Sequence, residues 1–253
     1  MGEQKWPDAL WLVRHGESAG NVAAIAAEKS GAAHIDIATR DMDVPLSARG
    51  ERQAKALGAW TGEQPAGQRP TAVLASPYKR ACQTAEIAMA AAGLGDVEIE
   101  ADERLREREF GLLDRLTKAG ITERYPGEAE RRSFLGKFYY RPIGGESWAD
   151  VVLRLRSVVD TLSLTYRHER LLVVTHQVVI GMFRYILEGM REQDVLAIDR
   201  EVEVANCSLT TYEYDPSAGR GGCLVLRSFN DTEPLTDEGE EVTEEPDVPV
   251  APR

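Results

Sequence analysis

The sequence has few cysteines, no long apolar segment and no secretory signal. Its three cysteines, Cys82, Cys207 and Cys223, are an odd number at wide spacing. This pattern argues against a disulfide framework and a cysteine-based zinc site, and it fits a reducing compartment. No apolar run approaches the roughly 20 residues that a membrane-spanning helix needs. The first residues also lack the apolar core of a secretory signal. We therefore expect a cytoplasmic protein with no membrane partner.

Acidic residues outnumber basic ones, but they are unevenly distributed. The net charge is −12, of which residues 231–253 carry −8 and residues 1–230 carry −4. The acidic segment has four prolines and few large apolar residues, so it has little surface to bury in return for becoming ordered. We predict a folded domain over residues 1–230 and a disordered acidic tail over residues 231–253. The mildly acidic domain gives no indication of nucleic acid as a partner.

Short apolar runs alternate with helical patterns along the chain. Strands are predicted at residues 10–13, 71–75, 98–99, 170–174, 208–214 and 223–229. Helices are predicted after Ser47, which is placed to cap its helix, and at residues 80–92, 149–166 and 177–187. Residues 104–147 are polar, aromatic and irregular, as expected of a long functional excursion. The fold class predicted is α/β, a single three-layer α/β/α domain with a mostly parallel central sheet and an antiparallel addition.

Two of the predicted buried strands are followed by histidine, His15 and His176. Ligands collect at the carboxyl ends of strands in an open parallel sheet, so these two imidazoles are expected to share one site. Arg14 precedes His15, and Arg80 lies in the first turn of a predicted helix. Guanidinium groups suit phosphate oxygens, and a neutral imidazole can attack phosphorus. The pattern favours phosphotransfer with a histidine nucleophile.

A leaving alkoxide needs a proton, and Glu107 and Glu109 in the irregular segment are the candidate acids. Each feature also has a structural interpretation. A histidine at a strand end often has only a structural role, and the Arg-Glu alternation of residues 104–109 is also typical of a solvated face. The chain has no G-x-x-x-x-G-K-[ST] loop and no H-E-x-x-H pair. The conjunction of the two histidines with the arginines and the acid therefore favours the catalytic interpretation.

Five motifs, in this order, resemble the signature of the histidine phosphatase superfamily, also called the phosphoglycerate mutase-like family. They are Leu12-Val13-Arg14-His15-Gly16-Glu17-Ser18 with Asn21, Pro45-Leu46-Ser47-Ala48-Arg49-Gly50 with Gln53-Ala54, Ser76-Pro77-Tyr78-Lys79-Arg80-Ala81-Cys82-Gln83-Thr84-Ala85, Leu105-Arg106-Glu107, and Val174-Thr175-His176. The resemblance covers about residues 10–214. It implies a phosphoglycerate mutase-like fold.

The resemblance also implies a role for each matching residue. His15 would be the nucleophile that carries the phosphoryl group, and Glu107 would be the proton donor that later activates water. Arg14, Arg80 and His176 would bind the phosphoryl oxygens, assisted by Asn21. Glu107 ranks above Glu109 because it holds the position of the family motif. No metal or organic cofactor is implied.

The central segment is similar to the fructose-2,6-bisphosphatase branch of the family. The similar pieces are Tyr125-Pro126, Lys137-Phe138-Tyr139-Tyr140-Arg141-Pro142, Gly145-Glu146-Ser147 and His176-Gln177. By this likeness Lys137, Tyr140 and Arg141 are candidate contacts to a second anionic or sugar part of the substrate, and Gln177 is a further candidate. The alternative for the first three is a basic-aromatic loop that packs on the core.

Other features resemble the cofactor-dependent mutases, namely Glu107-Arg108 and Arg131-Arg132-Ser133. However, the mutase pattern has tyrosine in place of Phe110 and a longer insertion before the helix that begins near Glu146. We therefore predict a metal-independent phosphatase whose partner is a small phosphorylated substrate, for example a sugar phosphate. A phosphoglycerate mutase-type phosphotransferase, a protein phosphatase of the same family and a non-catalytic binding module are the alternatives. The oligomeric state is not indicated.

Overall fold

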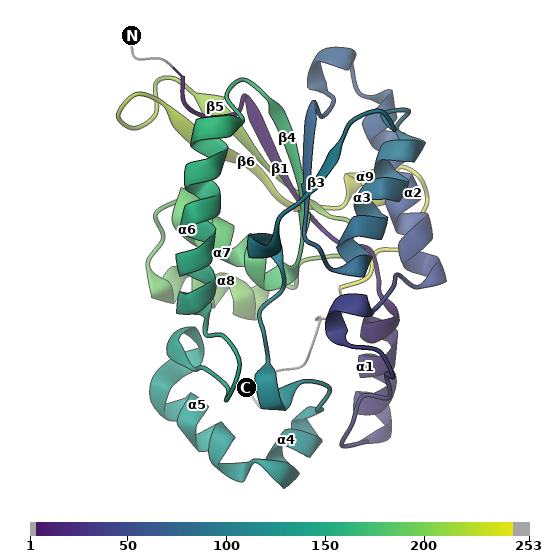
Figure 1. Cartoon of the computed structure of the whole chain (residues 1–253), viewed down its shortest axis with the longest axis vertical. Helices are drawn as coiled ribbons and strands as arrows, with labels where there is room; N and C mark the ends of the chain where they lie inside the picture. The colour runs from purple at the N-terminus through teal and green to yellow at the C-terminus, as the bar shows by residue number, and fades with distance from the viewer. Residues whose placement is uncertain (1–3, 245–253) are drawn as a thin grey trace.

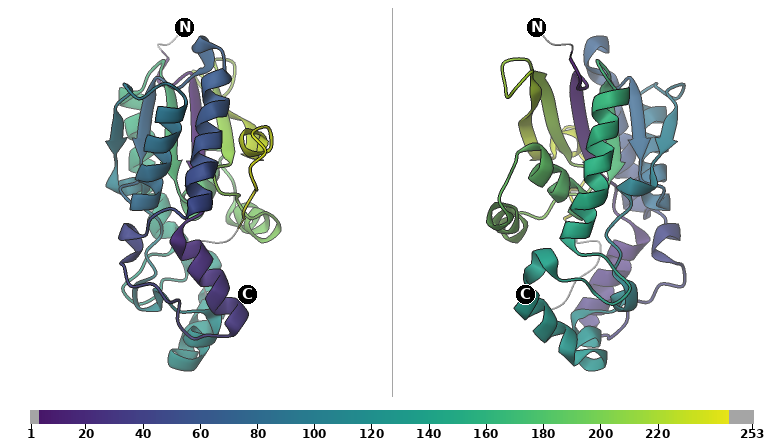
Figure 2. Two further views of the ribbon diagram at one scale, coloured as in Figure 1. Left: turned by 90° about the vertical axis from the view of Figure 1, so that its right-hand side faces the viewer. Right: turned by 60° about the vertical axis from the view of Figure 1, so that its left-hand side comes forward.

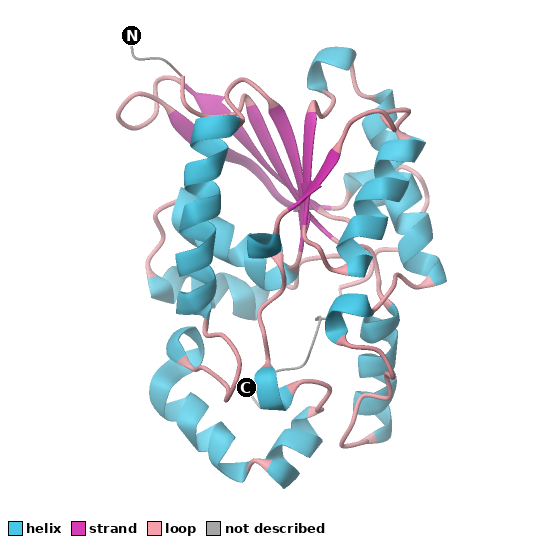
Figure 3. Ribbon diagram, in the orientation of Figure 1, coloured by secondary structure: helices cyan, strands magenta, loops and turns pink. Residues whose placement is uncertain are grey.

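Short apolar segments form the strands of one six-stranded sheet (Figures 1 and 3). The structure, a computed structural model, describes residues 4–244. The strands are β1 (Ala9–Arg14), β2 (Ala72–Ala75), β3 (Ile99–Ala101), β4 (Arg170–Thr175), β5 (Leu209–Asp215) and β6 (Cys223–Asp231). Their order is β3-β2-β4-β1-β5-β6, in which the first four run parallel, β5 is antiparallel to β1, and β6 is antiparallel to β5. The predicted mostly parallel sheet with an antiparallel addition is confirmed.

Alternate side chains of the central strands enter two separate apolar layers. Leu12 and Val173 belong to the layer that includes α6 (Trp148–Thr165) and α7 (Gln177–Leu187). Their neighbours Val13 and Val174 belong to the layer that includes α2 (Ala48–Glu63) and α3 (Lys79–Ala91). Figure 1 shows these helix pairs on opposite faces of the sheet. The predicted three-layer α/β/α domain is confirmed, because the strands are apolar on both faces.

The predicted helices form close to their expected positions. Ser47 caps α2 as predicted, since its hydroxyl accepts a hydrogen bond from the Gly50 amide at 3.0 Å. The other helices are α1 (Ala19–Ser30), α4 (Lys118–Arg124), α5 (Pro126–Tyr139), α8 (Glu192–Glu201) and α9 (Glu233–Thr236). Within residues 4–244, no helix has both the length and the apolar composition needed to cross a membrane.

Helices also form where the sequence prediction had none, and α8 is one of them. No helix was expected at residues 19–30, yet α1 begins there behind a capping box formed by Ser18 and Asn21. The segment 104–147, expected to be irregular, contains α4 and α5, which lie at the far end of the molecule from the N-terminal end of β1 (Figures 1 and 2). Glycine at position 136 takes a positive φ of 75° and kinks α5. Neither helix shows a clear apolar stripe in the sequence, which is why periodicity missed them.

The prediction that the chain is disordered from residue 231 onward is wrong for residues 231–244. Leu235 of α9 is fully buried against the α2 and α3 layer. Arg52 and Arg49 of α2 form ion pairs with Glu240 and Glu241. A few well-placed apolar side chains and paired carboxylates therefore hold this segment, although its average composition is that of a disordered one. Residues 245–253, the rest of the predicted tail, lie outside the described residues.

The buried position of Leu235 predicts that this segment contributes to stability. Leu235→Ala should lower the free energy of unfolding by about 2–4 kcal/mol, because it removes a buried side chain and leaves a cavity. Leu153→Ala is the matched control, since Leu153 of α6 is 69% exposed and should change stability by less than about 0.5 kcal/mol. Urea denaturation measures both variants. Equal effects would contradict the docking of α9.

Candidate active site

The two predicted histidines lie side by side at one edge of the sheet. β1 and β4 are parallel neighbours, with Arg14 opposite Thr175, so the next residues, His15 and His176, leave the sheet together. The His15 amide donates to the Thr175 carbonyl at 2.9 Å. The two imidazole rings meet edge to face with their centroids 5.1 Å apart, and both are fully buried. The structure therefore brings together the two histidines expected to share a site.

Hydrogen bonds fix the orientation and tautomer of the His15 ring. Its Nδ1 lies 2.7 Å from the Gly16 carbonyl, which can only accept, so Nδ1 carries the proton. Its Nε2 accepts a hydrogen bond from Nε of Arg80 at 3.2 Å. The lone pair of Nε2 therefore faces a cationic guanidinium. The neutral ring therefore keeps its lone pair on Nε2, and a substrate would have to displace the Arg80 hydrogen bond to reach that lone pair.

The guanidinium of Arg80 is held by Asp41, a residue that sequence reasoning missed. Asp41 begins a single 3-10 turn, Asp41–Asp43. Its carboxylate accepts from Nη1 at 2.9 Å and from Nη2 at 3.2 Å, and its carbonyl accepts from Nη1 at 2.7 Å. The Arg80 side chain is almost fully buried and that of Asp41 is partly exposed. Asp41 thus fixes one end of the fork while Nε points to His15.

Arg14 and His176 are positioned by loops at the same edge of the sheet. Nη1 of Arg14 donates to the carbonyl of Val204 at 2.5 Å, in the loop between α8 and β5. Nε2 of His176 lies 2.8 Å from the Ser76 hydroxyl, which follows β2. The ring of His176 also meets Tyr78 edge to face at 5.2 Å. Ser76 and Tyr78 belong to the motif at residues 76–85, and sequence reasoning missed their individual roles.

The two candidate acids have different surroundings. Glu107 is buried; its carboxylate accepts from the amide of Arg108 at 2.7 Å and, at 3.5 Å, from that of Val178 in the first turn of α7. A helix N-terminus favours a carboxylate, and this one directly follows His176. Glu109 is exposed and accepts from the hydroxyl of Tyr78 at 2.9 Å. This placement agrees with the preference for Glu107.

Burial alters the acid–base properties of two side chains next to these acids. Burial first, and then the Glu109 carboxylate, raises the pKa of Tyr78 above its usual range. Burial, reinforced by the nearby positive charge of Arg132, lowers the pKa of Arg108 to about 10. Tyr78 therefore stays protonated and Arg108 stays charged at neutral pH. Both keep their roles as hydrogen-bond donors there.

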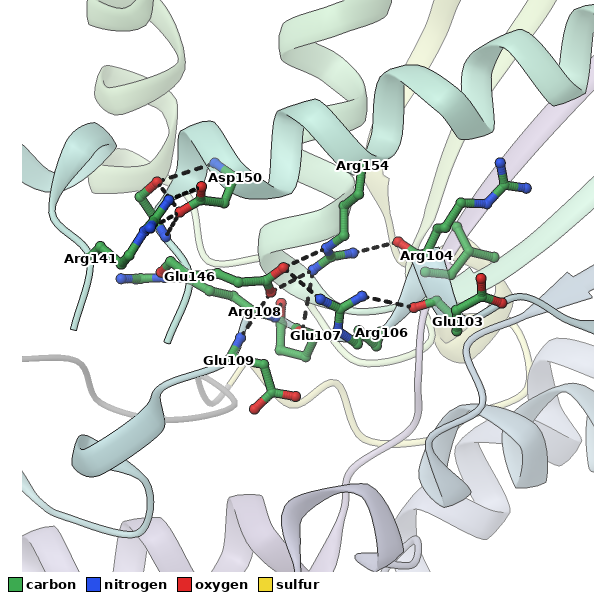
Figure 4. A network of polar contacts seen from close by, with 12 residues as sticks. Glu103, Arg104, Arg106, Glu107, Arg108, Glu109, Arg141, Glu146, Asp150 and Arg154 are labelled. Carbon is green, nitrogen blue, oxygen red and sulfur yellow. Dashed lines mark hydrogen bonds and ion pairs between the residues drawn. The ribbon is translucent and has the colours of Figure 1, made fainter. Parts of the chain in front are cut away.

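A network of ion pairs supports the segment that carries Glu107 (Figure 4). The Glu146 carboxylate accepts from Arg106 at 2.7 Å and from Arg154 of α6 at 3.1 Å. Arg154 also donates to the carbonyl of Glu107 at 3.4 Å. Although Glu109 is exposed, Arg106 and Glu107 are therefore paired within the protein rather than solvated. These contacts hold Glu107 against α6 and α7.

Asn21 lies in the same region but is engaged in the cap of α1. Its Oδ1 accepts from the amide and hydroxyl of Ser18 at 2.9 and 2.8 Å, and it is almost fully buried. The stretch Gly16-Glu17-Ser18-Ala19-Gly20 also fits the G-x-S-x-G pattern of serine nucleophiles. Here, however, the Ser18 hydroxyl accepts from the Asn21 amide and donates to its side chain. This makes Ser18 a capping residue.

Lys137 and Gln177 lie near a small cavity beside α7. Lys137 forms an ion pair with Asp199 of α8 and lies over the ring of Trp148, 5.0 Å from its centroid. Burial lowers the pKa of Lys137, although Asp199 opposes the shift. The Gln177 amide donates to Glu203 at 2.7 Å. Trp148, Asp199 and Gln177 all line the cavity, whose volume is about 30 Å³.

Tyr140 and Arg141, the other two candidates, are placed differently. Tyr140 is fully buried, and its hydroxyl donates to Glu128 at 2.6 Å, so it packs in the core as the structural alternative predicted. Arg141 is exposed and pairs with Asp150, which belongs to the capping box of α6. Among residues 4–244, no group of three or more His, Cys, Asp or Glu side chains is arranged to hold a metal ion.

The Arg141–Asp150 pair gives a testable pH effect. Burial acts to raise the pKa of Asp150, but hydrogen bonds from Arg141 and Ser147 outweigh it and lower the pKa to about 2. The resulting stabilisation is present above the unfolded pKa and is lost as pH falls from about 4 toward 2. Arg141→Ala should raise the pKa of Asp150 and reduce this loss, as measured by ¹³C NMR titration and acid denaturation. Arg40→Ala, which removes a different exposed ion pair, should change neither; an unchanged pKa in Arg141→Ala would refute the pairing.

The chain is similar to known proteins over most of its length. A profile of the histidine phosphatase superfamily (branch 1) matches residues 10–227. The chain is 28% identical over 229 residues to the probable phosphoglycerate mutase GpmB of Proteus mirabilis, covering 90% of this chain and 95% of that protein. It is 34% identical over 188 residues to the fructose-2,6-bisphosphatase of Saccharomyces cerevisiae, covering 74% of this chain and 36% of that protein. It therefore spans only about a third of the yeast protein.

Solved structures show the same fold. YhfR of Bacillus stearothermophilus superimposes with a TM-score of 0.69 at 26% identity, covering 89% of this chain and 98% of that one. A mycobacterial glucosyl-3-phosphoglycerate phosphatase, solved with VO3, gives a TM-score of 0.68 at 24% identity, covering 89% and 100%. The second similarity concerns the fold alone. Together they confirm the predicted phosphoglycerate mutase-like architecture.

Proposed function

The chain belongs to the histidine phosphatase superfamily, and we propose that it is a metal-independent phosphatase that hydrolyses a small phosphomonoester through a phosphohistidine on His15. The observation that carries the proposal is the environment of His15. Its Nδ1 proton is committed to the Gly16 carbonyl, and its Nε2 lone pair faces Arg80. A phosphoryl group placed between Nε2 and the guanidinium would meet a nucleophile and a cation at once.

In the first chemical step, Nε2 of His15 attacks phosphorus as the bond from phosphorus to the ester oxygen breaks. Arg14, Arg80 and His176 hold the non-bridging oxygens, and Asn21 assists. The leaving oxygen takes the proton of the Glu107 carboxyl group and departs as the alcohol. The hydrogen bond that Nδ1 donates to the Gly16 carbonyl stabilises the positive charge that develops on the ring, because the carbonyl dipole points at Nδ1.

In the second step the Glu107 carboxylate takes a proton from water, and the water oxygen attacks the phosphohistidine. The bond from phosphorus to Nε2 breaks, which releases inorganic phosphate and restores neutral His15. The buried position of Glu107 beside the N-terminus of α7 supports this double role. The fixed charges of Arg14 and Arg80 offset the charge of the phosphoryl oxygens, and in this proposal they replace a divalent metal.

The rest of the substrate would extend toward Lys137 and Gln177. Lys137 supplies a positive charge close to the cavity that Gln177 lines, which suits an anionic or sugar group. A cavity of this volume holds little more than one water-sized group. A sugar could therefore bind there only if the ion pair between Lys137 and Asp199 separated. Tyr140 and Arg141 have no part in this proposal, because their side chains serve the core and the cap of α6.

The assignment of the nucleophile predicts where phosphate accumulates. During turnover of a phosphomonoester in the presence of a chelator, acid-labile phosphate should be found on His15, and His15→Ala should abolish turnover. Mass spectrometry after an acid-free quench locates the label. His34→Ala is the control, since this histidine belongs to an isolated bridge with Leu116 and should leave turnover unchanged. Label on His176 or on a serine, or activity restored only by a divalent ion, would exclude the mechanism.

The similarity to a probable phosphoglycerate mutase makes mutase activity the second candidate. A mutase must keep water from its phosphohistidine until the bound phosphoglycerate has reoriented and taken the phosphoryl group back. A phosphatase must admit a water beside Glu107. The segment between α5 and α6 is short, so few residues are available there to cover the site and exclude water. This favours hydrolysis.

Phosphate release should therefore exceed the interconversion of 3- and 2-phosphoglycerate, even with 2,3-bisphosphoglycerate supplied as primer. Both activities are measured on one preparation, by phosphate release and by NMR of the phosphoglycerates. Glu107→Gln should lower both by about 100-fold or more, because it removes the shared acid. Interconversion faster than hydrolysis would identify a mutase.

A further inference from the structure

The loop that carries His15 is held from behind by two buried amide side chains. Nδ2 of Asn206 donates to the carbonyl of His15 at 2.9 Å. Oε1 of Gln53 accepts from the amide of Glu17 at 2.8 Å. Both side chains are fully buried. They therefore contact the backbone on either side of Gly16, whose carbonyl orients the His15 ring.

One hydroxyl joins these two amides. Oγ1 of Thr243 donates to Oδ1 of Asn206 at 2.9 Å and accepts from Nε2 of Gln53 at 2.9 Å. Thr243 thus holds the Asn206 side chain through its oxygen and the Gln53 side chain through its nitrogen. A rotated Asn206 or Gln53 side chain would lose its bond to Thr243 and its bond to the loop together. Thr243 itself is buried.

The backbone of the same segment adds further contacts. The carbonyl of Thr243 accepts a hydrogen bond from the backbone N–H of Asn206 at 2.8 Å. The carbonyl of Glu241 accepts one from Nε2 of Gln53 at 3.0 Å. Asn206 belongs to the loop whose Val204 carbonyl accepts from Arg14. Residues 241–244 therefore brace two loops, one that carries the nucleophile and one that orients a phosphate-binding arginine.

We propose that Thr243 is a positioning residue for the phosphoryl-transfer reaction, and that residues 241–244, here termed the C-terminal brace, keep the His15 loop in its reactive geometry. This inference rests on the proposed function for its kinetic consequence. Its structural content is the pair of amide orientations that Thr243 fixes. Small displacements of a nucleophile lower the rate steeply, because attack requires alignment with the reacting bond.

The test compares Thr243→Val, which keeps the side-chain shape but lacks the hydroxyl, with Thr243→Ser, which keeps the hydroxyl. Thr243→Val should lower kcat for p-nitrophenyl phosphate about 10-fold with KM within about 2-fold, and Thr243→Ser should retain most of the activity. Thr236→Val is the matched control. Thr236 is exposed, and its hydroxyl donates only to the carbonyls of Thr232 and Glu233, so wild-type kcat is expected.

Amide hydrogen exchange provides a readout that needs no catalysis. In Thr243→Val the peptide containing residues 14–18 should exchange at least about 10-fold faster, while the peptides of β2 and α6 exchange as in the wild type. If the wild type hydrolyses no phosphomonoester, the proposed function fails, and the exchange result still decides the role of Thr243. Unchanged exchange and unchanged kcat overturn the inference. So does a loss of activity that matches the loss of folded protein, because that outcome describes stability alone.

Discussion

The parallel pairing of β1 with β4 is the constraint from which the site is built. It places Arg14 opposite Thr175, so the chain leaves both strands at the same level and sets two imidazoles in contact. The pairing is itself secured by side chains that are apolar on both faces of the sheet. A shift of one strand by one residue would send each of its side chains into the opposite layer and disrupt the packing of both layers. The same register that builds the core therefore also fixes the distance between His15 and His176.

Around this pair, buried charges are accompanied by partners from distant parts of the chain. Asp41 comes from a turn after α1, Val204 from the loop before β5, and Glu146 from the loop before α6. A buried ion without such partners is costly, and a partly satisfied network is worse than an apolar core. The site thus depends on several loops being in place at once. Its geometry is set by contacts along the whole carboxyl edge of the sheet.

The sequence was sufficient to predict features that depend on local pattern. Buried strands, the cap at Ser47 and the two histidines at strand ends follow from apolar runs and from the rule that ligands gather at that edge. The role of Asp41 could not be predicted, because the position of an aspartate in a polar loop does not indicate which arginine it will pair with. The order of residues 231–244 was missed for a related reason. Composition averages over a segment, whereas this one is held by particular residues, namely the buried Leu235 and Thr243 and the carboxylates that pair with α2.

The brace at Thr243 has a consequence for biosynthesis. Thr243 is 190 residues beyond Gln53, to which it bonds, so the translating ribosome supplies it after every strand of the sheet. Domains begin to fold as the chain emerges, and the core can form before residues 241–244 are available. The His15 loop would then reach its final geometry only after residues 241–244 have emerged. A nascent chain that stops short of residue 241 would hold a formed core around a His15 loop that its brace has not yet fixed.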